Sequence, residues 1–309
     1  MTVAMKEAGR RTRFLSRRAL TGWWFMSPGL AVVLAVTIFP ILYSVYMSFN
    51  RIGLTTRGFR FHWVGTANYH LLFSNSLYRY AIVFTVVYAL TTVFVELIIG
   101  MAAALLLQRL KLGRPVLLAL LLLPWSLITV ISAEMWGYIY NGVYGVLDAL
   151  LLNLHLIHTP IVWLGFAKLA IMSTMFADVW KTMPFVAILL LAGLEMVPVD
   201  IIEAAHMDGA SNWQIFWKII IPLIRPTMSL AVLFRLLQAF GLFDLPFVLT
   251  GGGPGTATES IAVMGYQVMF QDLSFGPGAA IAASTTGLVL IMALAFLWVF
   301  RGMAQEVVA

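Results

Sequence analysis

Six long apolar stretches divide this 309-residue chain, and they constrain its fold more than any other feature. They cover residues 23–48, 80–107, 116–139, 168–192, 226–250 and 278–300. About 20 apolar residues in a helix cross the hydrocarbon core of a bilayer, so each stretch is long enough to span it once. A helix satisfies its own backbone hydrogen bonds in lipid, and none of the stretches has the two-residue alternation of a membrane barrel strand. The sequence therefore predicts an all-α polytopic membrane protein with six transmembrane helices.

The composition excludes most soluble folds. Hydrophobic residues make up 61% of the chain and charged residues only 10%. Soluble domains have about 25% charged residues, which they need to cover their surface. A bundle of very apolar helices in water would require charged covering elements, and this chain has too few charged residues to form them.

The positions of the basic residues indicate the orientation of the spans. Lys and Arg cluster before the first span and fill the short loop 109–115, whereas residues 140–167 and 251–277 contain neither. By the positive-inside rule, both termini and the 109–115 loop are expected to be cytoplasmic. The arginines of the 49–79 loop argue the other way, but the helix count and the N-terminal cluster outweigh them. The net charge of +6 thus belongs to membrane boundaries and does not indicate nucleic-acid binding.

The predicted organisation is a single membrane domain with short ends. Residues 1–22 form a basic cytoplasmic N-terminus, residues 23–300 the transmembrane domain, and residues 301–309 a cytoplasmic C-terminus. The first apolar run is too long for a signal peptide and lacks a small-residue cleavage site, so we expect a retained anchor. One long polar interruption, residues 193–222, separates the fourth and fifth spans.

Residues 193–222 predict two short helices joined by a tight turn. Pro198 and Asp200 begin the first helix, and Asp200 with Glu203 forms a capping-box-like pair. Gly209 suits the left-handed residue that ends a helix.

The second helix of this interruption has its own start signal. Ser211 and Gln214 have the spacing of a capping box. The apolar and aromatic residues that follow predict a helix that ends before Pro222.

The same interruption carries a motif with four elements at fixed offsets. Glu203-Ala204-Ala205 is followed after three residues by Gly209, and after nine more residues by Ile219-Ile220-Ile221-Pro222. This pattern closely resembles the EAA loop of ATP-binding-cassette importer permeases, with Ile221 where leucine is usual. The resemblance implies that the loop couples the chain to an ATPase. The residues that carry this role would be Glu203, Ala204, Ala205, Asp208, Gly209 and Pro222.

Two further strings resemble the sugar-importing branch of this family. Residues 64–69 resemble a Val-Gly-x-x-Asn-Tyr stretch that follows the first helix in sugar-importer permeases. The Thr-Gly-Gly-Gly-Pro string at residues 250–254 resembles the first-permease type of sugar and glycerol-phosphate importers. A glycine-rich exit turn alone would also explain that string.

Over most of residues 20–300 the chain resembles a binding-protein-dependent sugar permease of the maltose and glycerol-3-phosphate importer class. The resemblance implies a bacterial plasma (inner) membrane subunit that forms half of a translocation pathway. Its implied partners are a second permease in a heterodimer, two ATPase subunits that bind ATP and Mg²⁺, an extracytoplasmic sugar-binding protein, a sugar and membrane lipid. The chain itself would need no cofactor and no metal. It also resembles permeases of trehalose importers, which implies a disaccharide, although no residue names the sugar.

Ionisable residues inside spans usually line a cavity or pair with one another. Asp178 and Lys181 share one helix face, either as a purely neutralising ion pair or as part of a substrate pathway. Trp180 beside them would pack against a pyranose ring. Gln238 and Asp244 complete the substrate-pathway candidates. Both of these, with Glu96 and Glu134, are expected to be buried, and Arg235 on the fifth helix near Gln238 could serve either the structure or the pathway.

Enzyme signatures are missing from the sequence. There is no Gly-x-x-x-x-Gly-Lys-Ser/Thr loop, no His-Glu-x-x-His and no Gly-x-Ser-x-Gly, and the chain has no cysteine. A proton- or sodium-coupled secondary transporter remains an alternative, with Asp178, Glu96 and Glu134 as coupling groups. A membrane enzyme acting on lipid-linked sugars is a second alternative, with Glu134 or Asp148 as the acid. Neither alternative accounts for the EAA-like loop.

Overall fold

The computed structural model describes residues 17–56, 58–110 and 112–305, and the chain forms two compact units, residues 1–46 and 47–309. The described part of the first unit is one continuous helix, composed of α1 (Arg17–Val33), the π-helical turn η1 (Leu34–Ile38) and the start of α2 (Phe39–Ser48). The π turn precedes Pro40, whose ring would otherwise clash with the carbonyl four residues earlier. Residues 21–48 are long and apolar enough to cross a membrane.

The second unit begins with a small module that packs against the long helices through Phe59 and Leu72. Strands β1 (Asn50–Thr55) and β2 (Gly58–Trp63) form an antiparallel hairpin whose register pairs Asn50 with Trp63, and α3 (Ala67–Ser74) follows. The Asn68 side-chain amide donates to the carbonyls of Ser48, at 2.7 Å, and Asn50, at 3.1 Å. These two bonds attach α3 to the start of the hairpin.

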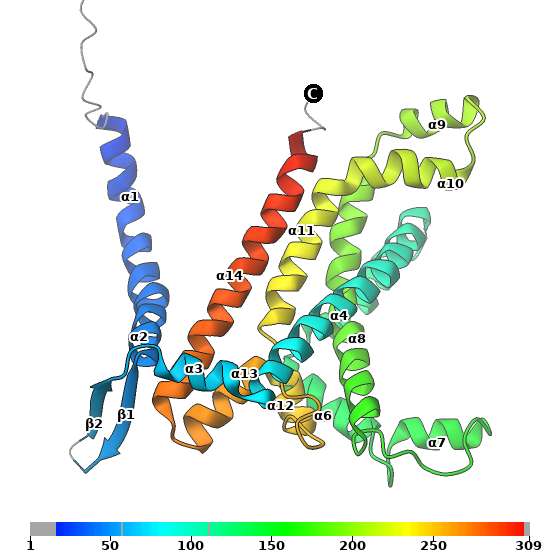
Figure 1. Ribbon diagram of the computed structural model, residues 1–309. Helices are drawn as coiled ribbons and strands as arrows, with labels where there is room; N and C mark the ends of the chain where they lie inside the picture. The colour runs from blue at the N-terminus through cyan, green and yellow to red at the C-terminus, as the bar shows by residue number, and fades with distance from the viewer. Residues whose placement is uncertain (1–16, 57, 111, 306–309) are drawn as a thin grey trace, which may run out of the picture. The chain divides into compact units, whose positions relative to one another are not determined.

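Four long helices form the body of the second unit (Figure 1). They are α4 (Ser76–Arg109), α8 (Ala167–Glu195), α11 (Ile221–Phe240) and α14 (Phe275–Gln305). Residues 76–109, 167–195, 212–240 and 275–300 are each long and apolar enough to cross a membrane. Together with the helix of the first unit they give five spans in the described part of the chain. The predicted all-α membrane fold is confirmed.

The predicted third span is broken. α5 (Arg114–Ser126) and α6 (Thr129–Ile139) meet at an angle of 92°, so this pair is either one bent span or a re-entrant segment. Pro124 lies in the last turn of α5, where it removes a backbone donor and weakens the helix end. Leu127 and Ile128 are extended, which completes the break.

The predicted fifth span, residues 226–250, has the wrong limits. The helix runs from α10 (Asn212–Ile215) through the π turn η2 (Phe216–Ile220) into α11, and residues 212–240 form the span. The expectation that the second helix of the polar loop ends before Pro222 is therefore wrong. η2 contains Lys218, the residue whose carbonyl the Pro222 ring would meet in a regular helix, so the π turn accommodates the proline.

Small residues bring the long helices close together. A Cβ atom on Gly100 of α4 would lie 3.1 Å from the Val186 side chain of α8, and one on Gly193 of α8 would lie 3.0 Å from Thr227 of α11. Helices in membranes pack through such small residues because lipid supplies no hydrophobic force between them. α4, α8 and α11 therefore form the packed centre of the unit.

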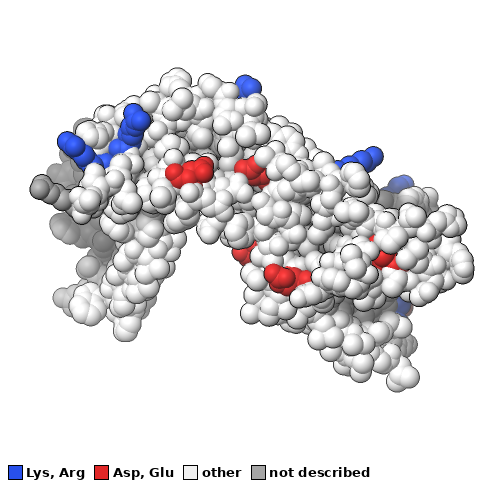
Figure 2. All heavy atoms as spheres, turned by 90° about the horizontal axis from the view of Figure 1, so that it is seen from below, with Lys and Arg blue, Asp and Glu red and all other residues white. Residues whose placement is uncertain are grey.

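The short elements lie at the two ends of the second unit. α9 (Val199–Met207) and α10 lie at one end. The β-hairpin, α7 (Val146–Asn153), α12 (Asp244–Thr250) and α13 (Ile261–Tyr266), which the π turn η3 (Gln267–Gln271) follows, lie toward the other (Figure 1). Figure 2 shows a surface on which only a few charged side chains interrupt uncharged residues, as the low charge content requires.

Candidate functional site

The loop between α8 and α11 has two of its predicted local features. Gly209 has a φ of +80°, the left-handed conformation that ends α9. The Ser211 amide donates to Gln214 Oε1 at 2.8 Å, and the Gln214 amide donates to Ser211 Oγ at 3.3 Å, which completes the capping box of α10. A left-handed turn and a capping box therefore fix the angle between the two helices.

The capping pair predicted for α9 is wrong. α9 begins at Val199 with Pro198 as its N-cap residue, two residues earlier than a pair led by Asp200 requires. Proline offers no capping oxygen, but its fixed φ suits a helix start. Asp200 lies in the first turn, where its negative charge favours the helix dipole. Glu203 is thus free of a capping role and is exposed on α9.

The residues of the EAA-like motif divide between the surface and the interior. Ala205 is buried and Pro222 is half-buried. The exposed members are Glu203, Ala204, Asp208 and Gly209. Large apolar side chains are exposed beside them, including Met207 at 88% and Trp213 at 70% of their accessible surface. An acidic and small-residue helix face bordered by exposed apolar side chains is typical of a protein-docking surface.

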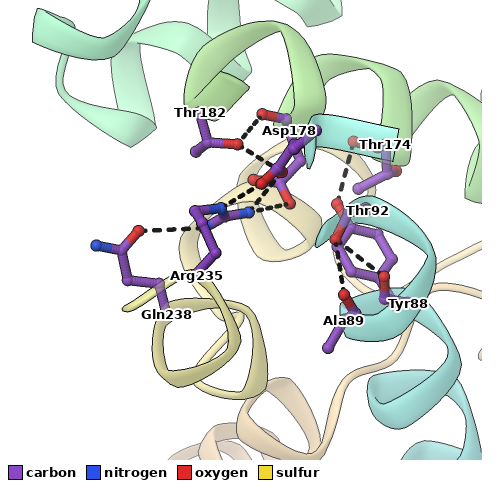
Figure 3. Close-up of polar contacts among 9 residues, drawn as sticks. Tyr88, Ala89, Thr92, Thr174, Asp178, Thr182, Arg235 and Gln238 are labelled. Carbon is purple, nitrogen blue, oxygen red and sulfur yellow. Dashed lines mark hydrogen bonds and ion pairs between the residues drawn. The ribbon is translucent and has the colours of Figure 1, made fainter. Parts of the chain in front are cut away.

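A second group of polar residues lies inside the helix bundle and is called here the buried charge cluster. It consists of Glu96 on α4, Asp178 on α8 and Arg235 on α11, which are 0%, 7% and 2% exposed (Figure 3). Arg235 donates to Glu96 through Nε at 2.5 Å and Nη2 at 2.7 Å, and its Nη2 also lies 3.3 Å from Asp178 Oδ2. One guanidinium therefore joins three helices.

Neighbouring hydroxyl groups and an amide extend the cluster. The Thr182 hydroxyl lies 2.7 Å from Glu96 Oε1, and the Tyr88 hydroxyl donates to the Thr174 carbonyl at 3.1 Å. Arg235 Nη1 donates to Gln238 Oε1 at 3.1 Å (Figure 3). Gln238 is exposed, so it connects the buried cluster to the surface of the helix bundle.

The neutralising pair considered for Asp178 and Lys181 is wrong. Asp178 pairs with Arg235, and the described residues show no ion pair between Asp178 and Lys181. The planar guanidinium binds two carboxylates at once, which an ammonium group one helical turn away does less well. Lys181 is half-buried.

The other pathway candidates have different surroundings. Trp180 is half-buried, and its ring lies 5.4 Å from that of Trp136 in an edge-to-face contact. Asp244 is exposed at the start of α12, and Glu134 is exposed on α6. The structure thus brings Asp178, Lys181 and Gln238 to one neighbourhood around Arg235, whereas Glu134 is not part of the cluster.

The pairing of Glu96 with Arg235 was not predicted from sequence. Four acids, Glu96, Glu134, Asp178 and Asp244, and three bases, Lys168, Lys181 and Arg235, lie inside the predicted spans. Because unpaired charges in a membrane are costly, a charge in one span predicts a partner in another, and this was a usable signal. This signal does not identify which acid pairs with which base, because Glu96 and Arg235 are 139 positions apart in the sequence.

Comparisons with known proteins agree on one family. Residues 64–305 match the model of the family described as binding-protein-dependent transport system inner membrane component. The trehalose/maltose transport system permease protein MalF of Thermococcus litoralis is 39% identical over 289 residues, covering 92% of this chain and 95% of that protein. The trehalose transport system permease protein SugA of Mycobacterium tuberculosis is 33% identical over 294 residues, covering 95% and 92%. These relatives are named as transport permease subunits and not as enzymes.

A solved structure shares the fold. It is a bacterial alginate ABC transporter in complex with an alginate pentasaccharide-bound periplasmic protein, with a TM-score of 0.78, 18% sequence identity, and coverage of 93% of this chain and 97% of that one. The fold likeness, the family match and the apolar helices agree with an inner-membrane multi-pass permease. The chain belongs to the family of binding-protein-dependent transport system inner membrane components.

Proposed function

We propose that this chain is one of two transmembrane subunits of an ATP-driven importer of a disaccharide such as trehalose or maltose. The two relatives quoted above are named for these sugars. The observation that carries the proposal is α9, an exposed helix with the EAA-like pattern at one end of a membrane domain. A membrane helix bundle gains no stability from such a helix, so a partner outside the membrane explains it best.

The partner that fits α9 is an ATPase subunit, which binds the ATP and Mg²⁺ that this chain does not. Exposed Ala204 lets a second protein approach the helix backbone closely, and Glu203 offers a charge to its groove. ATP can shift the importer between its inward- and outward-facing states only through contacts that differ between those states. A rigid α9 supplies such a contact, because the Gly209 turn and the Ser211 capping box fix its angle to α10.

The surface around Gln238 is proposed as part of the sugar pathway. Gln238 is exposed and Lys181 is half-buried on helices that cross the membrane, and Asp244 is exposed beside them. Polar side chains at such depths do not face lipid at equilibrium, so protein or water must cover them. A second permease would cover this face and complete an aqueous pathway in which sugar hydroxyls replace water. Asp178 and Trp180 lie behind it and support it.

The assembly proposed from this architecture is a heterodimer of permeases with two ATPase subunits and an extracytoplasmic sugar-binding protein. The Thr-Gly-Gly-Gly-Pro loop supports assignment as the first permease of the pair. Gly251 and Gly252 of this loop, and Gly255 just after it, have positive φ and form a tight turn at the end of the unit opposite α9. Both termini and α9 would be cytoplasmic, and the β-hairpin end would face the binding protein.

Reconstitution tests this proposal against ion-coupled transport. The chain is purified with the second permease and the ATPase from its own gene neighbourhood and placed in proteoliposomes with the binding protein. We expect uptake of labelled trehalose or maltose that requires Mg²⁺-ATP on the ATPase side and survives ionophores. Uptake by this permease without an ATPase, driven by a proton or sodium gradient, would overturn the proposal.

A further inference from the structure

An ion pair fastens α5 to the last residue of α8, immediately before the loop that leads to α9. Arg114 is the first residue of α5 and Glu195 is the last residue of α8, and Arg114 Nη2 bonds Glu195 Oε1. Both side chains are partly exposed to solvent. The contact joins residues 81 positions apart.

Each member of this pair lies at the helix end that disfavours its charge. The N-terminus of a helix carries partial positive charge and repels Arg114, and the C-terminus carries partial negative charge and repels Glu195. Reversed charges would suit both helix ends better. The pairing offsets both repulsions at once, so helix stability does not explain why these two charges are here, whereas a contact between the two helices does.

A second bond lies parallel to the ion pair. The Gln108 side-chain amide, near the end of α4, donates to the Leu194 carbonyl at 3.1 Å, and the same carbonyl accepts from the Val197 amide at 3.3 Å. Below it, Ala104 and Leu107 of α4 pack in one core cluster with Val197, which follows α8. The turn between α4 and α5 is thus fixed to the end of α8 on both sides.

The segment that connects the Arg114–Glu195 ion pair to α9 is very short. Only residues 196–198 separate Glu195 from Val199, where α9 begins. On the other side, α5 packs along α8 through Leu118 and Leu121, and the rings of Trp125 and Phe185 stack at 5.7 Å. A displacement of α9 therefore reaches Glu195 first along the chain, and the ion pair passes it to α5 and to the bend at residues 126–129.

We propose that the Arg114–Glu195 pair is a positioning contact that transmits movement of α9 to the bent α5–α6 segment. The inference rests on the proposed function, in which an ATPase moves α9. The two residues contact neither nucleotide nor sugar and act through the helices that they join. An ordinary surface ion pair of this exposure would contribute almost nothing to stability and nothing to coupling.

The test compares coupling with stability in the complete reconstituted importer. Arg114→Gln and Glu195→Gln each remove one charge, and the exchanged variant Arg114→Glu with Glu195→Arg restores the pair with both charges suited to their helix ends. Arg109→Gln is the matched control, because Arg109 is an exposed base at the end of α4, five residues earlier. The measured quantities are sugar imported per ATP hydrolysed and the unfolding temperature of the complex.

We expect both single variants to import at least about fivefold less sugar per ATP, the size of a modest coupling free energy, at an unchanged unfolding temperature. The exchanged variant should return to within about twofold of wild type, and Arg109→Gln should match wild type. A wild-type ratio in both single variants, or a fall that the exchanged pair does not reverse, overturns this inference and leaves the importer function intact. A wild-type complex that hydrolyses ATP without importing sugar overturns both.

Discussion

The Arg235 guanidinium on α11 binds both carboxylate oxygens of Glu96 on α4, with Nε 2.5 Å from Oε2 and Nη2 2.7 Å from Oε1. Bidentate pairs of this kind are among the strongest hydrogen bonds in proteins, and here neither residue is exposed to any extent that would weaken it. Removing one partner from such a pair leaves a buried charge without compensation. The pair therefore links α4 to α11, which otherwise pack against each other through apolar side chains.

Arg235→Met should destabilise the fold by about 3–5 kcal/mol, because it leaves both Glu96 and Asp178 buried without a counter-charge. Glu96→Gln should cost less, since Arg235 keeps Asp178 and the amide can still accept a hydrogen bond. Thermal unfolding of the purified complex in detergent measures both. Arg109→Gln, at the exposed end of α4, is the control and should unfold like wild type. An Arg235→Met protein as stable as wild type would show that this pair is not structural.

Gln238→Ala should slow uptake without affecting the fold. A sugar site that loses one buried hydrogen-bond partner loses about 1–3 kcal/mol, and Gln238 is exposed, so its removal leaves little unfilled space. The measurement is uptake at saturating binding protein, with unfolding temperature as the control. Unchanged uptake kinetics for alanine variants at each of Asp178, Trp180, Lys181, Gln238 and Asp244 would move the pathway elsewhere.

Asp148→Ala should loosen the segment between α7 and α8. Asp148 is buried and accepts from Trp163 Nε1 at 2.7 Å and from the Ile161 amide at 2.9 Å, so its loss leaves two donors unsatisfied at about 1–3 kcal/mol. Limited proteolysis of residues 154–166 measures the opening. Asp272→Ala, at an exposed acid in another loop, should not change the cleavage rate. Equal cleavage of the Asp148 variant and wild type would show that these two hydrogen bonds do not hold the segment between α7 and α8.

Glu259 makes stability depend on pH. It lies outside the spans, between α12 and α13, and burial raises the pKa of its carboxyl above the usual 4.5. Protonation therefore favours the folded state, and this contribution is complete below about pH 4.5 and is lost as pH rises through the folded pKa. Glu259→Gln should be more stable than wild type at neutral pH, with the difference shrinking toward pH 4.5. A difference that is constant with pH would exclude this titration.

Local features of this chain could be predicted from the sequence, because each depends on neighbouring residues. The left-handed turn at Gly209 and the capping box of Ser211 and Gln214 are both present. Apolar length alone located α4, α8 and α14 to within a few residues, whereas it displaced the span that contains α11.

Features that depend on distant residues or on local alternatives could not be predicted. The pairing of Arg235 with Glu96 depends on the packing of α4 against α11. Asp178 also forms its ion pair with Arg235 and not with Lys181, which is nearer in the sequence. A proline inside a helix usually ends it, but the π turn η2 lets the helix continue through Pro222 into α11. The 92° bend after Pro124 likewise has no counterpart in hydropathy, since α5 and α6 together are long and apolar enough for one span.

Coupling through α9 is the central claim, and Gly209→Val tests it most directly. Gly209 has a φ of +80°, and a Cβ atom added there would meet no described atom within 4 Å, so the change acts through backbone strain of about 1 kcal/mol or more and not through a clash. Gly58→Val is the matched control, because Gly58 has a φ of +109° with equal free space in the β-hairpin at the other end. Glu203→Ala removes the exposed charge of α9 without strain.

The measurement is sugar imported and ATP hydrolysed in the same proteoliposomes, with pull-down of the ATPase subunit. We expect Gly209→Val and Glu203→Ala to lose import per ATP or ATPase binding, whereas Gly58→Val should retain both. Wild-type import, hydrolysis and ATPase binding in both α9 variants would contradict it.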